Sequence, residues 1–158
     1  MTTTTTGYQA LQALTVTNLQ SLANGSYWQS AKIDNTPLGM WIEIFLTIVT
    51  TTTVAADALG TIDLYFAGSV DGGVDFQGQA SGTEGAYAIT GNNDQKHLDL
   101  IRSLSCDAIE ATARTYKYRA LKHDLPEDFA IIIANQSGAA LGAAGNTVEY
   151  RINRYDSA

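Results

Sequence analysis

The sequence contains one cysteine, Cys106, two prolines and only 16% charged residues. A single thiol cannot form an internal disulfide or a multi-thiolate zinc site. The longest unbroken apolar stretches are only a few residues long, far short of the roughly 20 residues that a membrane-spanning helix needs. We therefore expect neither a membrane partner nor a thiolate metal centre, and no cofactor or metal is predicted.

Positive charge is also scarce, with 9 lysines and arginines against 16 aspartates and glutamates and a formal net charge of −7. This excess of negative charge disfavours binding to the phosphates of nucleic acids, so no nucleic-acid partner is expected. No basic, then apolar, then cleavable segment begins the chain, because Met1 is followed by five threonines. We therefore do not expect export through a secretory signal.

The 158 residues, 45% of them apolar, are enough for one domain with a hydrophobic core. The threonine tract has no apolar periodicity, so residues 1–7 are expected to form an extended N-terminal arm and residues 8–158 a single domain. The arm has two interpretations, a frayed terminus or a segment that docks on a neighbouring subunit. In the second, the interface threonines are Thr2, Thr3, Thr4, Thr5 and Thr6.

Beyond the arm, apolar residues alternate with polar ones in short runs separated by Gly, Asn, Asp and Ser, which is typical of β-strands. The predicted fold class is all-β, a two-sheet antiparallel β-sandwich that is jelly-roll-like. The run from Gly39 to Thr50 is apolar on both faces, so we expect a central, covered strand there. Helical periodicity is confined to a turn or two near residues 53–59 or 94–101. The predicted strands are 11–18, 26–33, 39–50, 60–68, 85–90, 97–107, 112–121, 129–135 and 146–154.

Catalytic motifs are not recognisable around Cys106 or around the two histidines, His97 and His123. Cys106 stands in a strand pattern without the glycine-flanked elbow of a nucleophile, and His123 stands in a polar segment typical of a solvated loop. The segment from Ser69 to Phe76 approximates an Asp-box, in which Asp and Gly shape a hairpin turn. A structural turn is preferred there, with calcium binding as the alternative.

The aromatic residues allow more than one interpretation. Tyr27, Trp28 and Trp41 could stack on sugar rings, but packing in the core or at a subunit interface is preferred. Tyr116 and Tyr118 alternate with Lys117 and Arg119, which predicts a half-buried strand whose basic outer face fits an acidic neighbour.

Three stretches of the sequence resemble small β-sandwich structural proteins of tailed-phage virions, the head decoration or cement proteins and other minor components. They are LQSLANGSYWQS (19–30), IDLYFAGSVDGG (62–73) and LPEDFAIIIANQSGAAL (125–141). The resemblance implies a virion building block that is commonly oligomeric and has no catalytic role.

The expected function is therefore that of a non-enzymatic capsid decoration or cement protein, located in the virion. Its expected partners are the major capsid protein or other virion proteins and further copies of itself, arranged as a trimer. The expected interface residues are Tyr27 and Trp28 together with the threonine arm. The alternative is a tail- or fibre-associated module that binds host-surface carbohydrate through Trp28, Trp41 and the Asp71 loop.

Overall fold

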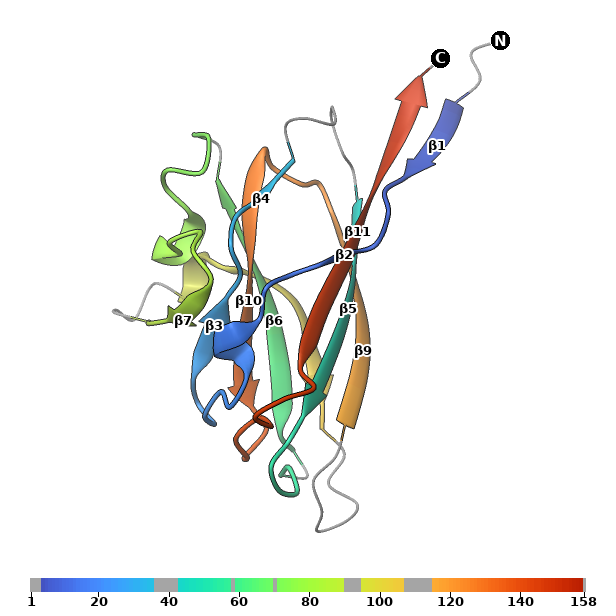
Figure 1. Cartoon of the computed structure of the whole chain (residues 1–158). Coiled ribbons are helices and arrows are strands. Elements are labelled where there is room, and N and C mark those ends of the chain that lie inside the picture. Colours follow the sequence, from blue (N-terminus) through green and yellow to red (C-terminus); the bar gives the residue numbers. More distant parts are fainter. Residues whose placement is uncertain are drawn as a thin grey trace.

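The computed structural model describes residues 4–35, 43–57, 59–69, 71–89, 95–106 and 115–157. The fold is all-β, and two antiparallel sheets pack face to face as a β-sandwich (Figure 1), which confirms the predicted fold class. Within these ranges, no helix has the length and apolar character that crossing a membrane would require.

Each sheet is built from strands that are distant in the sequence. Sheet A has the order β1 (Thr4–Tyr8), β11 (Thr147–Ser157), β5 (Glu43–Thr51) and β9 (Thr115–His123), and the short β2 (Gln12–Ala13) also pairs with β11. Sheet B has the order β7 (Gly85–Tyr87), β3 (Tyr27–Gln29), β10 (Asp128–Gln136), β6 (Thr61–Ser69) and β8 (Asp99–Ser105), and β4 (Ile33–Asp34) also pairs with β10.

The connections between the long strands cross from one sheet to the other. The chain passes from β5 in sheet A to β6 in sheet B, and the steps from β8 to β9, from β9 to β10 and from β10 to β11 cross in the same way. Such crossings are characteristic of Greek-key and jelly-roll sandwiches. Short 3₁₀ turns complete the described structure: η1 (Thr17–Leu19), η3 (Gln77–Gln79) and η4 (Gln95–His97).

Most predicted strands are present, with differences where side chains interrupt the pairing. The strand expected at 26–33 is divided into β3 and β4, because the hydroxyl of Ser30 accepts a hydrogen bond from the backbone N–H of Ile131 at 2.9 Å. The strand expected at 11–18 is reduced to β2 followed by η1. Of the expected helical turns, η4 falls within 94–101, and the described part of 53–59 holds no helix. Residues 39–42, 90, 107 and 112–114 of the expected strands lie outside the described residues.

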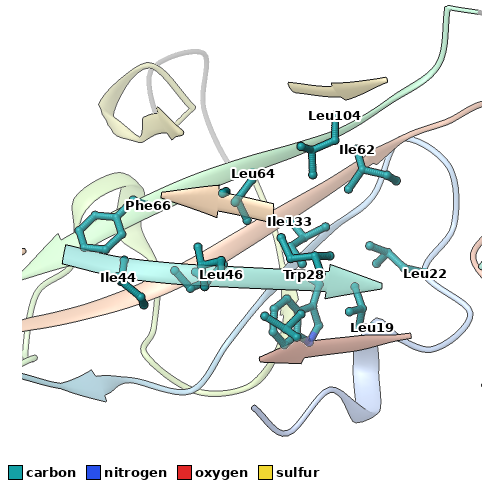
Figure 2. Packing of buried hydrophobic residues seen from close by; sticks show 14 of the residues in the cluster. Leu19, Leu22, Trp28, Ile44, Leu46, Ile62, Leu64, Phe66, Leu104 and Ile133 are labelled. Atoms are coloured by element: carbon teal, nitrogen blue, oxygen red, sulfur yellow. The ribbon is translucent and has the colours of Figure 1, made fainter. Parts of the chain in front are cut away.

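The main core lies between the two sheets. Figure 2 shows Ile44 and Leu46 from β5 facing Leu64 and Ile133 from sheet B. The rings of Phe66 and Phe129, on adjacent strands of sheet B, stack with centroids 4.8 Å apart. Burial of these side chains is the dominant favourable term in forming the sandwich.

A second apolar cluster lies on the outer face of sheet B. It combines sheet residues with residues from the long connection between β6 and β8, which folds back over the sheet. The members are Tyr65, Ala67, Phe76, Ala80, Tyr87, Leu98, Ala130, Ile132 and Ala134. Consequently β10 is buried on both faces from Asp128 to Asn135.

The doubly covered strand is therefore not the one expected from the sequence. The run from Gly39 to Thr50 was predicted to be covered on both sides, but Phe45 on the outer face of β5 remains 41% exposed. The alternation of side chains shows that both faces of the strand are apolar. It does not show whether another segment packs over the outer face, because that depends on the order and connections of the strands. The connection after β6 packs on sheet B, and so β10 gains the second cover.

Candidate interaction surfaces

The two termini form a ribbon of two strands. β1 pairs with the end of β11, with Thr4 opposite Ser157 and Gly7 opposite Arg154. The described pairing of β5 with β11 reaches only Asn153. The last residues of β11 and β1 therefore extend together past the body of the sandwich, as the red and blue strands show in Figure 1.

The pairing of β1 changes the expectation for the threonine arm. The arm is extended as predicted, but Thr4, Thr5 and Thr6 pair with the C-terminal strand of their own chain instead of remaining unpaired. Backbone groups withdrawn from water need partners, and the end of β11 supplies them. Because β1 is the last strand in the order of sheet A, its outer edge has no strand partner among the described residues. Thr2 and Thr3 lie outside those residues.

Trp28, expected to be an interface anchor, is fully buried in the core of its own chain. Its indole Nε1 donates a hydrogen bond to Oε1 of Glu84 at 2.8 Å. Asn18 donates to the same carboxylate from its backbone N–H and from Nδ2, each at 2.8 Å. In this arrangement the indole cannot touch a neighbouring subunit or stack on a sugar ring.

The carboxylate of Glu84 is held ionised by these contacts. Burial by itself would raise its pKa, but the hydrogen bonds from Trp28 and Asn18 outweigh burial and lower the pKa below its ordinary value. Hydrogen bonds to an ionised carboxylate are stronger than those between neutral groups. Glu84 therefore connects the polar edge of the Trp28 indole to η1.

Tyr27 lies on the opposite face of β3 from Trp28 and is half-buried. Its ring makes an edge-to-face contact with Tyr87, with centroids 6.1 Å apart. The two tyrosines border an open depression of about 580 Å³, which Leu22, Ala86 and Ile89 also line. Tyr27 thus remains available for contact with another molecule. Trp41, the other aromatic of the carbohydrate interpretation, lies outside the described residues.

The segment from Asp71 to Asp75 forms a turn organised by Asp71. The carboxylate of Asp71 accepts hydrogen bonds from the hydroxyl of Ser69 at 2.6 Å and from the backbone N–H groups of Val74 and Asp75 at 3.1 Å. The bond from Ser69, followed by those from the backbone, lowers the pKa of Asp71. Gly72 adopts a φ of 76°, a left-handed conformation that glycine tolerates. These contacts support the predicted structural turn.

The outer face of sheet A carries the basic strand that the sequence predicted. Lys117 and Arg119 of β9 are exposed, while Tyr116 and Tyr118 are half-buried and pack against the main core. The apolar neighbour of these basic residues has no local signal in the sequence. Phe45 on β5 lies directly opposite Leu121 on β9, and each is 41% exposed. Only the register between two strands that are distant in the sequence brings these two side chains together.

Two of the residues considered for catalysis, Cys106 and His123, make contacts within the fold. Cys106 is buried, and its Sγ lies 3.6 Å from the hydroxyl of Tyr118. Burial raises the pKa of this thiol, which disfavours the nucleophilic thiolate. The Nδ1 of His123, the last residue of β9, lies 3.1 Å from Oε1 of Glu43, the first residue of β5, and His97 is exposed in η4. In the described ranges no three His, Cys, Asp or Glu residues are gathered to hold a metal ion.

Together these features define a jelly-roll-like antiparallel β-sandwich with two kinds of candidate contact, a strand edge at the terminal ribbon and a basic, partly apolar sheet face. No known protein-family model matches the sequence. A comparison with curated proteins likewise gives no significant match.

Proposed function

We propose that this chain is a non-enzymatic structural protein of a tailed-phage virion, a decoration or cement protein that binds the capsid exterior. In this role it contacts the major capsid protein and further copies of itself, as a trimer, and bridges neighbouring shell subunits. Bridging stabilises a shell because an additional interaction must break before the subunits separate.

The observation that supports this proposal is the terminal ribbon with its outer strand edge. Strand edges with unpaired backbone groups accept a strand from another chain through main-chain hydrogen bonds. β1 has such an edge in the described structure, and its threonines favour the extended conformation. The ribbon extends away from the sandwich (Figure 1), so a neighbouring subunit can reach it.

The composition of the chain agrees with a surface that neighbours cover. Charged residues are only 16% of the sequence, and few charges mean a lower desolvation cost when an interface forms. Tyr27, half-buried beside an open depression, is the aromatic contact that we assign to this interface. Trp28 is not assigned to it, because the core of its own chain buries it completely.

The carbohydrate-binding alternative has less support. Of its three elements, Trp28 is buried, and the carboxylate of Asp71 is engaged by hydrogen bonds within its own turn. An aromatic side chain recognises a sugar through an exposed ring face, which Trp28 does not offer.

Reconstitution on particles tests the proposed function. The purified protein should bind phage shells that lack it and raise the temperature at which they release DNA. A variant without residues 1–7 should fold but show lower occupancy, whereas a variant with Thr2 to Thr6 changed to serine should keep most of its occupancy, because main-chain contacts tolerate side-chain changes. Equal occupancy without residues 1–7 would exclude the arm as a contact. A folded protein that binds no shell would overturn the proposed function.

A further inference from the structure

The outer face of sheet A has an apolar centre with a border of charged residues, most of them cationic. Phe45 lies between Leu121 of β9 and Arg151 of β11 in the strand register. In the next row, Thr47 lies between Arg119 and Glu149. Phe45 and Leu121 are each 41% exposed. An exposed cross-strand apolar pair within a charged border is typical of a surface that another protein covers.

Positive charge predominates on this face, although the chain as a whole carries a formal net charge of −7. The strand register places Lys117, Arg119 and Arg151 on it together with two acidic residues, Glu43 and Glu149. Glu43 is in contact with His123 at 3.1 Å. The face therefore favours an acidic partner.

The turn from Asp71 to Asp75 is apolar at Val74 and acidic at both ends, which complements the apolar and basic outer face of sheet A. Val74 is 77% exposed, and the exposed carboxylates of Asp71 and Asp75 flank it. The hydrogen bonds of Asp71 and a bond from Nζ of Lys32 to the carbonyl of Gly72 at 3.1 Å hold the turn in one conformation. A rigid, preorganised contact loses less entropy on binding than a flexible one.

The turn and the basic face lie on different sides of the molecule. The turn follows β6 and leads into the segment that covers the outer face of sheet B. Sheet A lies on the other side of the main core, as Figure 1 shows for β5, β9 and β11. One copy therefore cannot close this contact on itself, but two copies can.

We propose that the Asp71–Asp75 turn of one copy docks on the outer face of sheet A of a second copy. Val74 contacts the pair formed by Phe45 and Leu121, and the two aspartates approach Arg119 and its cationic neighbours. This contact joins two different surfaces, so it is heterologous and leads to a ring if the rotation closes. The proposal deepens the self-assembly part of the proposed function and rests on it, while its test requires no phage particle.

Sedimentation of complementary variants tests the contact. The face variant carries Lys117→Glu and Arg119→Glu, and the turn variant carries Val74→Ser and Asp75→Asn, a neutral change that gives the turn no new attraction to the acidic face of the first variant. The wild-type protein should associate beyond a dimer as its concentration rises toward about 1 mM. Each variant alone should associate at least about tenfold more weakly. An equimolar mixture should form a one-to-one dimer and nothing larger, because only one working face and one working turn remain to meet.

Lys96→Glu reverses one charge, as each substitution of the face variant does, and Glu127→Gln matches the charge change of the turn variant. Both controls are at exposed positions outside the two surfaces and should associate like the wild type. Far-ultraviolet circular dichroism verifies that each variant is folded. Val74→Ser alone, which changes an exposed side chain without changing the charge, provides a second variant of the turn.

A wild-type protein that stays monomeric up to about 1 mM, or a mixture that stays monomeric, would overturn the proposal. Failure of particle binding with intact association would instead count against the proposed virion function.

Discussion

The indole Nε1 of Trp28 and Oε1 of Glu84 are joined by a hydrogen bond of 2.8 Å, which connects the centre of the main core to the segment preceding β7. The same carboxylate accepts two hydrogen bonds from Asn18. Three chain segments are thus held by one acidic group. The polar edge of a buried tryptophan requires such a partner, and its loss should be measurable.

Replacement of Glu84 by glutamine should lower the free energy of unfolding by about 1–2 kcal/mol, because a charged acceptor becomes neutral. Its pKa lies below the ordinary value of 4.5, so its contribution is present above that value and is lost as the pH falls through the lowered pKa. Urea unfolding at neutral and acidic pH measures both effects. Glu84→Gln should reduce the loss of stability in acid, and Glu127→Gln, an exposed control, should not. Parallel pH dependence in the wild type and Glu84→Gln would contradict the prediction.

Because β10 is covered on both faces, adjacent residues that point to opposite faces should contribute similarly to the free energy of unfolding. Ile132 belongs to the outer cluster and Ile133 to the main core, and both are fully buried. Changing either one to alanine should cost about 2–4 kcal/mol of unfolding free energy in chemical denaturation. Leu59→Ala, at a position 95% exposed, should cost less than about 0.5 kcal/mol. If Ile132→Ala behaved like Leu59→Ala, the cover over sheet B would not form in solution.

Asn135 organises the turn after β10 through its buried side-chain amide. Its Nδ2 donates to the carbonyls of Leu22 and Ala139 at 2.9 and 2.8 Å, and its Oδ1 accepts from the hydroxyl of Ser137 at 2.6 Å. Asn135→Ala should destabilise the fold by about 2–3 kcal/mol, since it removes four buried hydrogen bonds and leaves the backbone N–H of Ser137 without its acceptor. Asn24→Ala, which removes an exposed acceptor for Gly138, should cost about 1 kcal/mol or less. Similar midpoints in thermal unfolding for the two variants would be inconsistent with this role.

Cys106 should be unreactive in the folded protein. Burial raises its pKa above the ordinary value of 9.0, so the thiol stays protonated at neutral pH. Labelling with a disulfide reagent should be at least about 100-fold slower in the native state than in denaturant, because the reagent must wait for local opening. Equal rates in the two conditions would show that the thiol is accessible and would reopen its assignment as a structural residue.

Local patterns predicted the elements that depend on residues close in the sequence. The alternation of Ile62, Leu64 and Phe66 predicted β6, and these residues do face the main core. The residues around Asp71 predicted a structural turn, because an aspartate there can cap nearby backbone N–H groups and the glycines allow the positive φ that such turns require. In contrast, the hydroxyl of Ser30 interrupts a predicted strand by bonding to Ile131, which is 101 residues away.

The candidate contacts were predictable only in part for the same reason. The basic side of β9 follows from Lys117 and Arg119 alone, but its apolar partner Phe45 is identified only by the strand register. The arm was recognised as extended, whereas its pairing with the other end of the chain has no local signal. The sequence alone does not distinguish a core position from an interface position for Trp28, because its burial and its bond to Glu84 depend on the tertiary fold.

The sequence by itself determined the all-β class, the positions of most long strands and the turn at Asp71, because side-chain alternation and turn chemistry act over a few residues. The tertiary structure alone decided which strand is covered on both faces, where Trp28 finds its polar partner and where the threonine strand pairs. These outcomes depend on contacts between residues far apart in the chain, whose order in space is set by how the two sheets close over a shared core.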